Sequence, residues 1–218
     1  MQSPLVSRWG CVIVRREIGV WDASAGWRSS TPVGNRGPEL VNQLGMWSRC
    51  SHAPTSRHFC PVTAEEWPVV ERLAQLERHD LSQFRGYVPR VDGTYAFDTL
   101  DLFRTEPGRQ AWLIRYGVTL AGFALTRPVE SGGTSMYAFF IVRGLRRHGV
   151  GLQSARELLR LIPGVWGIAF QDENADAQPF WERVATDAVG DRWHLEKGTG
   201  PEGRPPDIWL RLDTCSAP

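Results

Sequence analysis

The chain has 218 residues, of which 42% are hydrophobic, so it is long enough to bury the core of one globular domain. Its 25 lysines and arginines nearly balance its 24 aspartates and glutamates, and the resulting charge of +1 argues against a general attraction to nucleic acids or membranes. No run approaches the roughly 18 consecutive apolar residues of a membrane span. The four cysteines lack the spacing of a disulfide framework, so we expect a cytoplasmic protein.

The first 56 residues differ in composition from the rest of the chain. They are rich in Trp, Arg, Ser, Gly and Pro and show little hydrophobic periodicity, which predicts a poorly ordered N-terminal extension. Only residues 12–20 are typical of a strand or a short helix. We therefore expect a single folded domain over residues 57–214.

Helices are expected first within this domain. Thr63-Ala-Glu-Glu66 has the pattern of a capping box, and apolar residues from Trp67 to Leu76 follow it at helical spacing. A second short helix is expected over Asp80–Arg85. A long connection over residues 86–108 comes next, with a further helix near Ala96–Phe103.

The second half of the domain is predicted to alternate strands and helices. A turn at Gly117 favours a hairpin, and Pro163-Gly164 is a strong signal for a helix end. The predicted strands are Gln110–Tyr116, Thr119–Arg127, Ser135–Val142, Val165–Gln171, Trp193–Glu196 and Ile208–Leu212, and the predicted helices are Gly149–Ile162 and Asn174–Thr186.

The most informative segment is the basic turn between the strand Ser135–Val142 and the helix that begins at Gly149. It contains the pattern Arg146-x-x-Gly149-x-Gly151. The two glycines leave the first amides of the helix uncovered. These unpaired N–H groups, the helix dipole and the arginines all favour an anion at the same point. The turn therefore predicts a site for a phosphate or pyrophosphate.

Residues 57–213 resemble the GNAT superfamily of N-acetyltransferases. The resemblance rests on the Arg146-x-x-Gly149-x-Gly151 pattern, on the helix pattern Asn174-x-x-Ala177-x-x-Phe180-Trp181, and on the order of the elements. It implies an α/β (α+β) fold with a mixed, twisted central sheet of about six to seven strands and helices on both faces. It also implies a V-shaped gap where the neighbouring parallel strands Ser135–Val142 and Val165–Gln171 part.

The same resemblance implies acetyl-CoA, or another acyl-CoA, as the cofactor. Its pantetheine arm would pair with the free edge of the strand before the basic turn, and its pyrophosphate would meet the turn itself. The helix with the second pattern would line the arm from the other side of the gap. The implied cofactor-binding residues are Phe139, Phe140, Ile141, Arg146, Arg147, His148, Gly149, Val150, Gly151, Leu152, Asn174, Ala177, Phe180 and Trp181.

The sequence departs from the family at the two positions that would move protons. Where many relatives have a tyrosine that protonates the departing thiolate, this chain has Trp181, whose indole N–H cannot give up a proton. Where many relatives have a glutamate as the base, this chain has Ala138. A carboxylate from the acceptor side must then act as the base, and we select Asp101 as the catalytic residue.

The other predicted acceptor-binding residues are Asp80, Tyr95, Asp98 and Glu106. Asp98 and Asp101 stand among aromatic residues, and an aromatic and acidic wall would suit a cationic amine. His79 beside Asp80 could form a catalytic pair, although a histidine at a helix end more often lies on the surface.

We expect an N-acyltransferase that moves an acetyl or other acyl group from acyl-CoA to a primary amine by direct attack in a ternary complex. A small-molecule amine is the first choice of acceptor, and a protein N-terminus or lysine is the second. The alternative is a non-catalytic acyl-CoA-binding or regulatory module, which Ala138 and Trp181 favour. Neither a membrane nor a nucleic acid is expected as a partner.

A metal site is not expected. Cys50-x-His52 and His58-x-Cys60 contain four possible ligands, but one residue separates the members of each pair. Zinc-binding pairs usually have a spacer of two to four residues.

Overall fold

The computed structural model describes residues 57–130, 132–198 and 207–215, which belong to one compact unit spanning Gly45–Pro218. The predicted N-terminal extension of residues 1–56 lies outside the described residues, together with Cys50 and His52. The structure therefore bears on the predicted domain and on the site within it.

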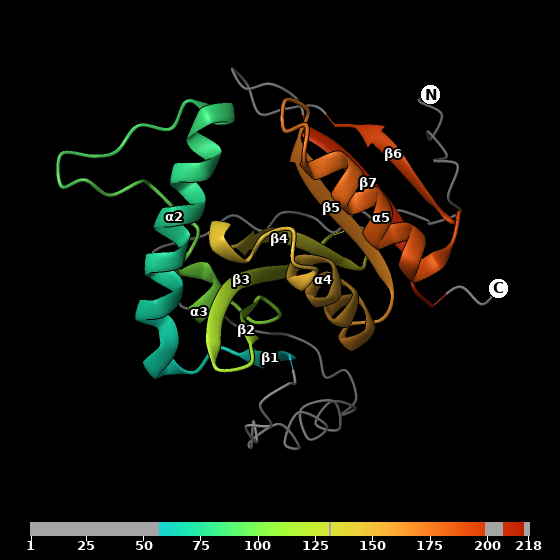
Figure 1. Cartoon of the computed structure of the whole chain (residues 1–218), viewed down its shortest axis with the longest axis horizontal. Helices are drawn as coiled ribbons and strands as arrows, with labels where there is room; N and C mark the ends of the chain where they lie inside the picture. Colours follow the sequence, from blue (N-terminus) through green and yellow to red (C-terminus); the bar gives the residue numbers. More distant parts are fainter. Residues whose placement is uncertain (1–56, 131, 199–206, 216–218) are drawn as a thin grey trace, which may run out of the picture. The chain divides into compact units, whose positions relative to one another are not determined.

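Within the described residues, seven strands form one mixed sheet, which confirms the predicted fold class (Figure 1). Their order is β1-β2-β3-β4-β5-β7-β6, and every neighbouring pair is antiparallel except β4 and β5, which are parallel. The sequence did not predict β1, because RHFCP lacks an alternation of apolar and polar residues. The strands are β1 Arg57–Pro61, β2 Gln110–Tyr116, β3 Thr119–Pro128, β4 Thr134–Ile141, β5 Val165–Gln171, β6 Trp193–Lys197 and β7 Asp207–Asp213.

The helix α2 is continuous over Trp67–Arg85, where the sequence predicted two helices. A short 3-10 turn precedes it and carries the predicted capping box, in which the Thr63 N–H donates to Glu66 Oε2 at 3.2 Å. The helix ends at Gly86, whose φ of 61° is the left-handed conformation that glycine adopts easily. The predicted break before Asp80 was wrong, because the polar side chains there face a cleft and do not mark a helix end.

Helices cover both faces of the sheet (Figure 1). The remaining ones are α3 Leu102–Thr105, α4 Val150–Leu161 and α5 Ala177–Val189. On one face α2 and α3 pack on β3 and β4, and on the other face α4 and α5 pack on the sheet. Buried residues of the first cluster include Val70, Leu73, Phe103, Phe123 and Phe140, and those of the second include Leu158, Trp166, Ile168, Trp181 and Val184. Burial of each such side chain contributes about 1.5–3 kcal/mol.

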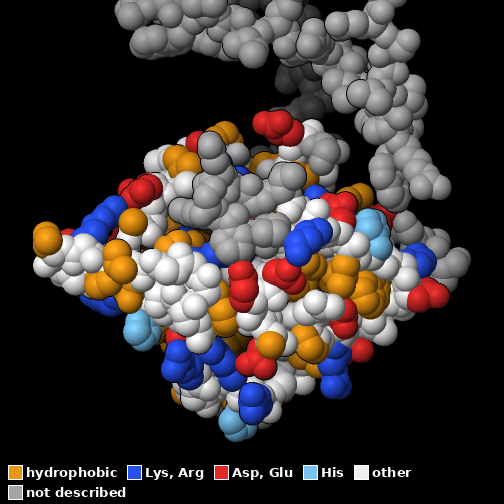
Figure 2. Space-filling model, turned by 90° about the horizontal axis from the view of Figure 1, so that it is seen from above, with side chains coloured by type: hydrophobic (Ala, Val, Ile, Leu, Met, Phe, Trp, Pro, Cys, Tyr) orange, Lys and Arg blue, Asp and Glu red, His pale blue; other side chains and the backbone are white. Residues whose placement is uncertain are grey.

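The described surface mixes both signs of charge. Figure 2 shows arginine and lysine side chains interspersed with aspartate and glutamate side chains over one face. Several of these groups form ion pairs, such as Arg115 with Glu66 at 3.0 Å and Arg211 with Glu196 at 2.6 Å. Charge is therefore neutralised locally as well as over the whole chain.

A β-bulge in β4 sets the direction of side chains beside the site. Thr126 pairs with Met136 but Leu125 pairs with Ala138, so Tyr137 is an extra residue in β4. Side chains change face around it: Tyr137 and Ala138 pack in the α2 cluster, whereas Met136 packs in the α4 cluster. The bulge therefore turns β4 directly after Met136, the last residue that pairs with β5.

Gly122 of β3 lies against the backbone of β4. A Cβ atom built at Gly122 would stand 1.9 Å from the carbonyl oxygen of Phe140. We predict that Gly122→Ala lowers the free energy of unfolding by roughly 3 kcal/mol, because the β4 backbone must move. Urea denaturation measures this loss. Gly144→Ala is the control, since nothing lies within 4 Å of its Cβ position. Equal losses in the two variants would contradict the prediction.

Candidate active site

The strands β4 and β5 pair over only three residues before they part. Residues 134–136 of β4 align with residues 166–168 of β5, and no pairing between the two strands follows in their remaining described residues. A cleft of about 740 Å³ opens between them, lined by β4, β5, α2, α4 and α5. The gap that the resemblance implied is therefore present at the predicted strands.

The edge of β4 that faces this gap keeps unpaired backbone groups. The Val142 N–H donates to the Ala121 carbonyl of β3 at 2.9 Å. Since hydrogen-bonding directions alternate along an antiparallel pair, the N–H and C=O groups of Phe139 and Ile141 point away from β3 and toward the gap. One of these groups is already used, because Arg146 Nε donates to the Ile141 carbonyl at 2.8 Å. The others can pair with an extended ligand.

The turn before α4 presents a second set of backbone donors. Arg147 has a φ of 62°, the one positive value among the described residues other than glycine, and Gly149 has a φ of 76°. Gly149 caps α4, and no side chain accepts from the first amides of that helix. Gly149, Gly151 and Leu152 line the cleft. Free N–H groups at the positive end of a 12-residue helix suit an anion.

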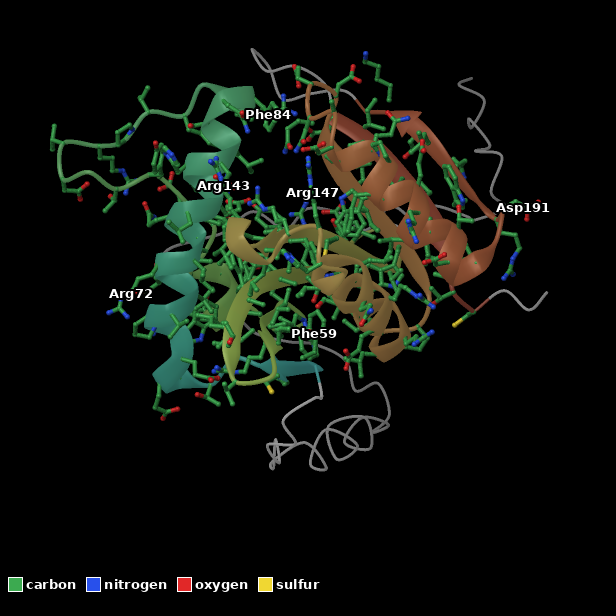
Figure 3. The ribbon with its side chains drawn as sticks, viewed as in Figure 1. Phe59, Arg72, Phe84, Arg143, Arg147 and Asp191 are labelled. Atoms are coloured by element: carbon green, nitrogen blue, oxygen red, sulfur yellow. The ribbon has the colours of Figure 1, made fainter. Side chains whose placement is uncertain are left out.

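Close packing holds α4 and α5 against the floor of the cleft. A Cβ atom at Gly151 would stand 3.4 Å from Ile141 Cγ1 and from Phe180 Cε2, so glycine allows the helices to approach. The ring of Phe139 lies 6.0 Å from that of Phe180 and 5.3 Å from that of Trp181. These aromatic rings form an apolar wall beside the free edge of β4. Figure 3 shows Arg147 at the turn before α4 and Phe84 near the end of α2, and both residues line the cleft.

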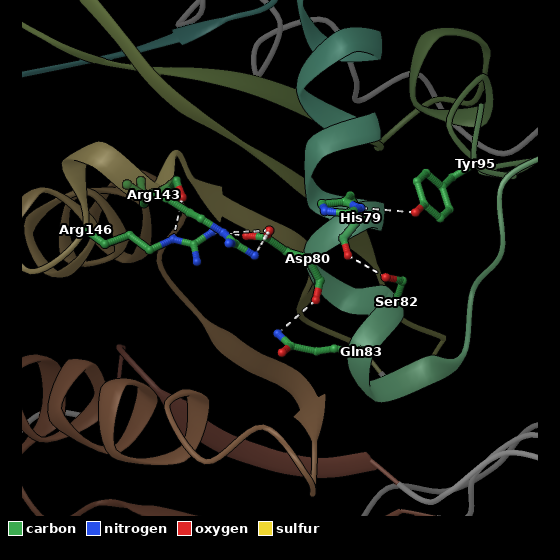
Figure 4. A network of polar contacts seen from close by, with 8 residues as sticks. His79, Asp80, Ser82, Gln83, Tyr95, Arg143 and Arg146 are labelled. Atoms are coloured by element: carbon green, nitrogen blue, oxygen red, sulfur yellow. Dashed lines mark hydrogen bonds and ion pairs between the residues drawn. The ribbon is translucent and has the colours of Figure 1, made fainter. Parts of the chain in front are cut away.

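Asp80 of α2 ties the basic turn to the helix (Figure 4). Arg143 Nη2 lies 2.7 Å from Asp80 Oδ1, and Arg146 Nη2 contacts Asp80 Oδ2. Burial would raise the pKa of Asp80, but hydrogen bonds and charge from Arg143 and Arg146 outweigh it and lower the pKa below its usual value. Asp80 lines the cleft as predicted for an acceptor residue, yet it is charged and committed to two arginines.

Glu77 lies one turn before Asp80 on the same helix, and sequence reasoning missed it. Its side chain lines the cleft, the residue is 7% exposed, and Oε2 has no hydrogen-bond partner. Burial raises the pKa of Glu77 to about 7, against a smaller opposing effect of Arg78, whose Nε lies 3.5 Å from Oε2. The available signal was its spacing, because Glu77 continues the buried stripe of Val70, Leu73 and Ala74.

The model of the acetyltransferase (GNAT) family matches residues 71–185, which is more than half of the chain. The chain belongs to this family. The matched span begins within α2 and ends within α5, so it contains both sides of the cleft. Among curated proteins, no sequence is significantly similar to the chain.

Solved structures of other family members share this fold. An acetyltransferase from Thermus thermophilus is 15% identical, with a TM-score of 0.56 over 73% of this chain and 98% of that one. A protein assigned to the GNAT acetyltransferases from Bacteroides thetaiotaomicron is 12% identical, with a TM-score of 0.52 over 73% of this chain and 89% of that one. At these identities, the likeness supports the shared architecture only.

The structure does not bring the other predicted acceptor residues into the cleft. The side chain of Asp101 is 82% exposed and lies 3.7 Å from Arg104, and that of Asp98 is 80% exposed and pairs with Arg90. Glu106 pairs with Arg109, and the Tyr95 hydroxyl lies 3.1 Å from His79 Nδ1. None of these four predicted residues lines the cleft. The loop over residues 86–108 carries them away from the gap, so Asp101 is poorly placed to act as a base.

The predicted cofactor-binding residues line the cleft, except for His148 and Val150. Val150 is buried in the core beneath the sheet, and the His148 ring lies outside, where Nδ1 is 2.7 Å from the Arg146 carbonyl. Ala138 lies on the α2 side of β4, the side from which Glu77 enters the cleft. The cleft thus contains the carboxyl group of Glu77, which α2 carries, whereas the glutamate of many relatives would lie on β4.

In the described part of the chain, no cluster of three or more His, Cys, Asp or Glu side chains could hold a metal ion. No described helix is long and apolar enough to cross a membrane.

Glu77 makes the stability of the domain depend on pH. Since its pKa is raised to about 7 in the folded protein, its contribution to stability is fully present below its unfolded pKa and is lost as pH rises through 7. We predict that the free energy of unfolding falls by about 3 kcal/mol from this group between pH 4.5 and pH 8. Glu77→Gln should remove this part of the slope in denaturation curves recorded across that range.

Glu71→Gln provides the control for this measurement. Glu71 lies on the same helix, but its side chain is 49% exposed and pairs with Arg104 at 3.5 Å, a surface contact of small energy. Its replacement should leave the slope unchanged. A Glu77→Gln protein with the slope of the wild type would show that Glu77 titrates normally.

Proposed function

We propose that this protein transfers an acyl group from acyl-CoA to a primary amine, with acetyl-CoA as the donor. The observation that carries the proposal is the joint placement of three features in one cleft. These are the unpaired edge of β4, the start of α4 with no side-chain cap, and the buried carboxyl group of Glu77. Membership in the acetyltransferase family supports the same reaction.

The cleft residues fit the chemistry of coenzyme A. The amides at the start of α4 would hold the pyrophosphate, and Gly149 keeps a side chain away from that point, since only Gln153 Nε2 lies within 4 Å of its Cβ position. Phe139 and Ile141 would pair with the amides of the pantetheine arm. Phe180, Trp181, Asn174 and Ala177 would line the arm from α5 and the turn before it. The thioester of acyl-CoA would supply the acyl group.

Glu77 would act as the general base in place of Asp101. A primary amine with a pKa near 10.4 must lose a proton before attack, which costs about 4–5 kcal/mol at pH 7. A carboxylate with a pKa of about 7 accepts that proton far more readily than an ordinary glutamate does. Asp80 is unsuited to this role, because two arginines stabilise its charged form.

Backbone groups would assist the rest of the step. The N–H groups of Phe139 and Ile141 point into the gap, where one can donate to the thioester carbonyl oxygen as negative charge develops on it. The amine nitrogen then forms a bond to the carbonyl carbon and loses its second proton to water, and the carbon–sulfur bond breaks. Because Trp181 cannot supply a proton, the thiol would leave as a thiolate and take its proton from water.

A small-molecule acceptor is part of this proposal. A volume of about 740 Å³ lies within the range of roughly 300–1,000 Å³ that is typical of small-molecule sites. The pantetheine arm and the acceptor would share this space. A compact amine suits the remaining room better than a folded protein surface does.

Gly149→Glu tests the pyrophosphate site. We predict that this variant loses at least about 100-fold in CoA affinity by calorimetry, because a carboxylate would stand at the start of α4. The positive φ of Gly149 also adds strain of about 1–3 kcal/mol, so thermal unfolding must be recorded in parallel.

Two variants separate charge from strain. Gly149→Ala has the same strain without the charge and should lose much less affinity. Gly144→Glu places the same charge in the preceding turn, outside the cleft, and should bind CoA normally. If Gly149→Glu binds CoA as tightly as Gly144→Glu does, the pyrophosphate lies elsewhere.

The pH dependence of the reaction tests Glu77 as the base. A base works in its deprotonated form, so we predict that kcat/KM rises with pH and levels off above about 7 in the wild type. Glu77→Gln should lower kcat by about 100-fold or more at pH 7 with CoA affinity unchanged. Glu71→Gln is the matched control. A protein that binds CoA but acylates none of a broad amine panel would instead be a binding module.

A further inference from the structure

Two arginines of the cleft bracket a stack of aromatic rings. Arg78 Cζ lies 3.7 Å from the centroid of Phe97, which stacks on Tyr137 at 6.3 Å. On the other side, Arg127 Cζ lies 5.0 Å from the centroid of Tyr137. Arg78, Tyr137 and Arg127 all line the cleft. The rings fix both guanidinium groups by cation–π contact, in a place that the proposed cofactor residues do not occupy.

Most other arginines that line the cleft are paired or lie in the open. Arg146 is paired with Asp80, and Arg85 is paired with Asp207 and lies 3.7 Å from Glu173. Arg147 is exposed at the turn before α4. Arg78 lies near Glu77 and donates from Nη1 to the Tyr87 hydroxyl at 3.2 Å. Each of these guanidinium groups therefore has a polar partner in the protein or is exposed to solvent.

Arg127 is the partly buried arginine of the cleft to which no ion pair is formed within the described residues. Its Nε, like that of Arg78, has no hydrogen-bond partner, but Arg78 also has Glu77 and the Tyr87 hydroxyl as partners. Its side chain contacts the face of Tyr137, which cannot accept all the hydrogen bonds of a guanidinium group. A buried donor without an acceptor costs free energy that an anionic ligand would recover.

The position of Arg127 suits an acceptor more than the cofactor. Arg127 pairs with Ser135, next to the point where β4 and β5 begin to part, while the pyrophosphate turn lies beyond the other end of β4. The bulge at Tyr137 directs this ring, and with it Arg127, to the α2 side of β4, from which Glu77 enters. Two contacts hold the ring of Tyr137 in place. Its hydroxyl lies 2.7 Å from Thr99 Oγ1, and its ring centroid lies 5.1 Å from that of Phe103.

We infer that the acceptor is an amine that also carries a carboxylate, and that Arg127 binds this carboxylate. The inference rests on the proposed acyl transfer and narrows its substrate class to amino acids and related amino-carboxylates. It replaces the cationic amine expected from Asp98 and Asp101, since neither residue lines the cleft. The fork of N–H donors in arginine matches two carboxylate oxygens, which gives selectivity over amines that lack the group.

Matched pairs of acceptors test the inference. The probes are glycine with methylamine, phenylalanine with phenethylamine, and alanine with ethylamine, in which the second member lacks the carboxylate. For at least one pair, we expect the wild type to favour the first member in kcat/KM by about 10- to 100-fold. Arg127→Gln should remove that preference, mainly through KM, and leave CoA affinity unchanged.

Two further variants keep the result interpretable. Arg127→Lys keeps the positive charge but not the paired N–H donors of the guanidinium group, so it should retain part of the preference. This variant still reports on the anion site if Arg127→Gln fails to fold. Arg72→Gln is the control, because Arg72 is exposed on the outer side of α2 (Figure 3) and does not line the cleft. It should behave as the wild type. Thermal unfolding of each variant confirms that the domain is folded.

The outcomes separate this inference from the proposed function. If amines are acylated without a preference for the carboxylate, or if Arg127→Gln keeps the preference, the inference is wrong and acyl transfer stands. If no amine is acylated, acyl transfer is wrong, and calorimetry with the same probes in the presence of CoA decides the inference. Binding of an amino acid that weakens about 10-fold or more in Arg127→Gln supports the anion site. Equal binding by the two proteins refutes it.

Discussion

The early parting of β4 and β5 is the constraint on which the rest of the site depends. After three paired residues, each strand is held by its other neighbour alone, β4 by β3 and β5 by β7. Backbone groups inside a protein are nearly always paired, so an open edge next to the core is costly unless water or a ligand completes it. The same divergence lets the start of α4 and the polar face of α2 line the cleft from its two sides. If β4 and β5 were paired along their full length, the cleft would be closed and its free strand edge would be lost.

Two carboxyl groups of α2 line the cleft but differ in pKa. Asp80 and Glu77 are one turn apart, yet their pKa values move in opposite directions. Arg143 and Arg146 stabilise the charged form of Asp80 and join the basic turn to the helix. Glu77 is buried with no hydrogen bond to Oε2, so its proton is held more tightly. One group thus serves the structure of the turn, and the other is poised to exchange a proton near neutral pH.

Local signals in the sequence were enough for most elements, including the basic turn before α4. The strand–turn–helix around Gly149 follows from an apolar run, two glycines and a helical stripe, and each of these is encoded within a few residues. The edge strand β1 was missed because RHFCP carries no pattern and forms its strand by pairing with β2. The burial of Glu77 and the exposure of Asp101 could not be predicted in this way. Burial and exposure of these side chains depend on where α2 and the loop over residues 86–108 pack, which is a tertiary property.

Hydrogen exchange measured by mass spectrometry, with and without CoA, tests the central claim most directly. If the open edge of β4 and the start of α4 receive this ligand, peptides covering residues 137–141 and 147–152 should exchange markedly more slowly when CoA is added. Peptides from β1 and β2, on the far edge of the sheet, should not change. Protection confined to other segments, with both cleft segments exchanging as before, would contradict the account.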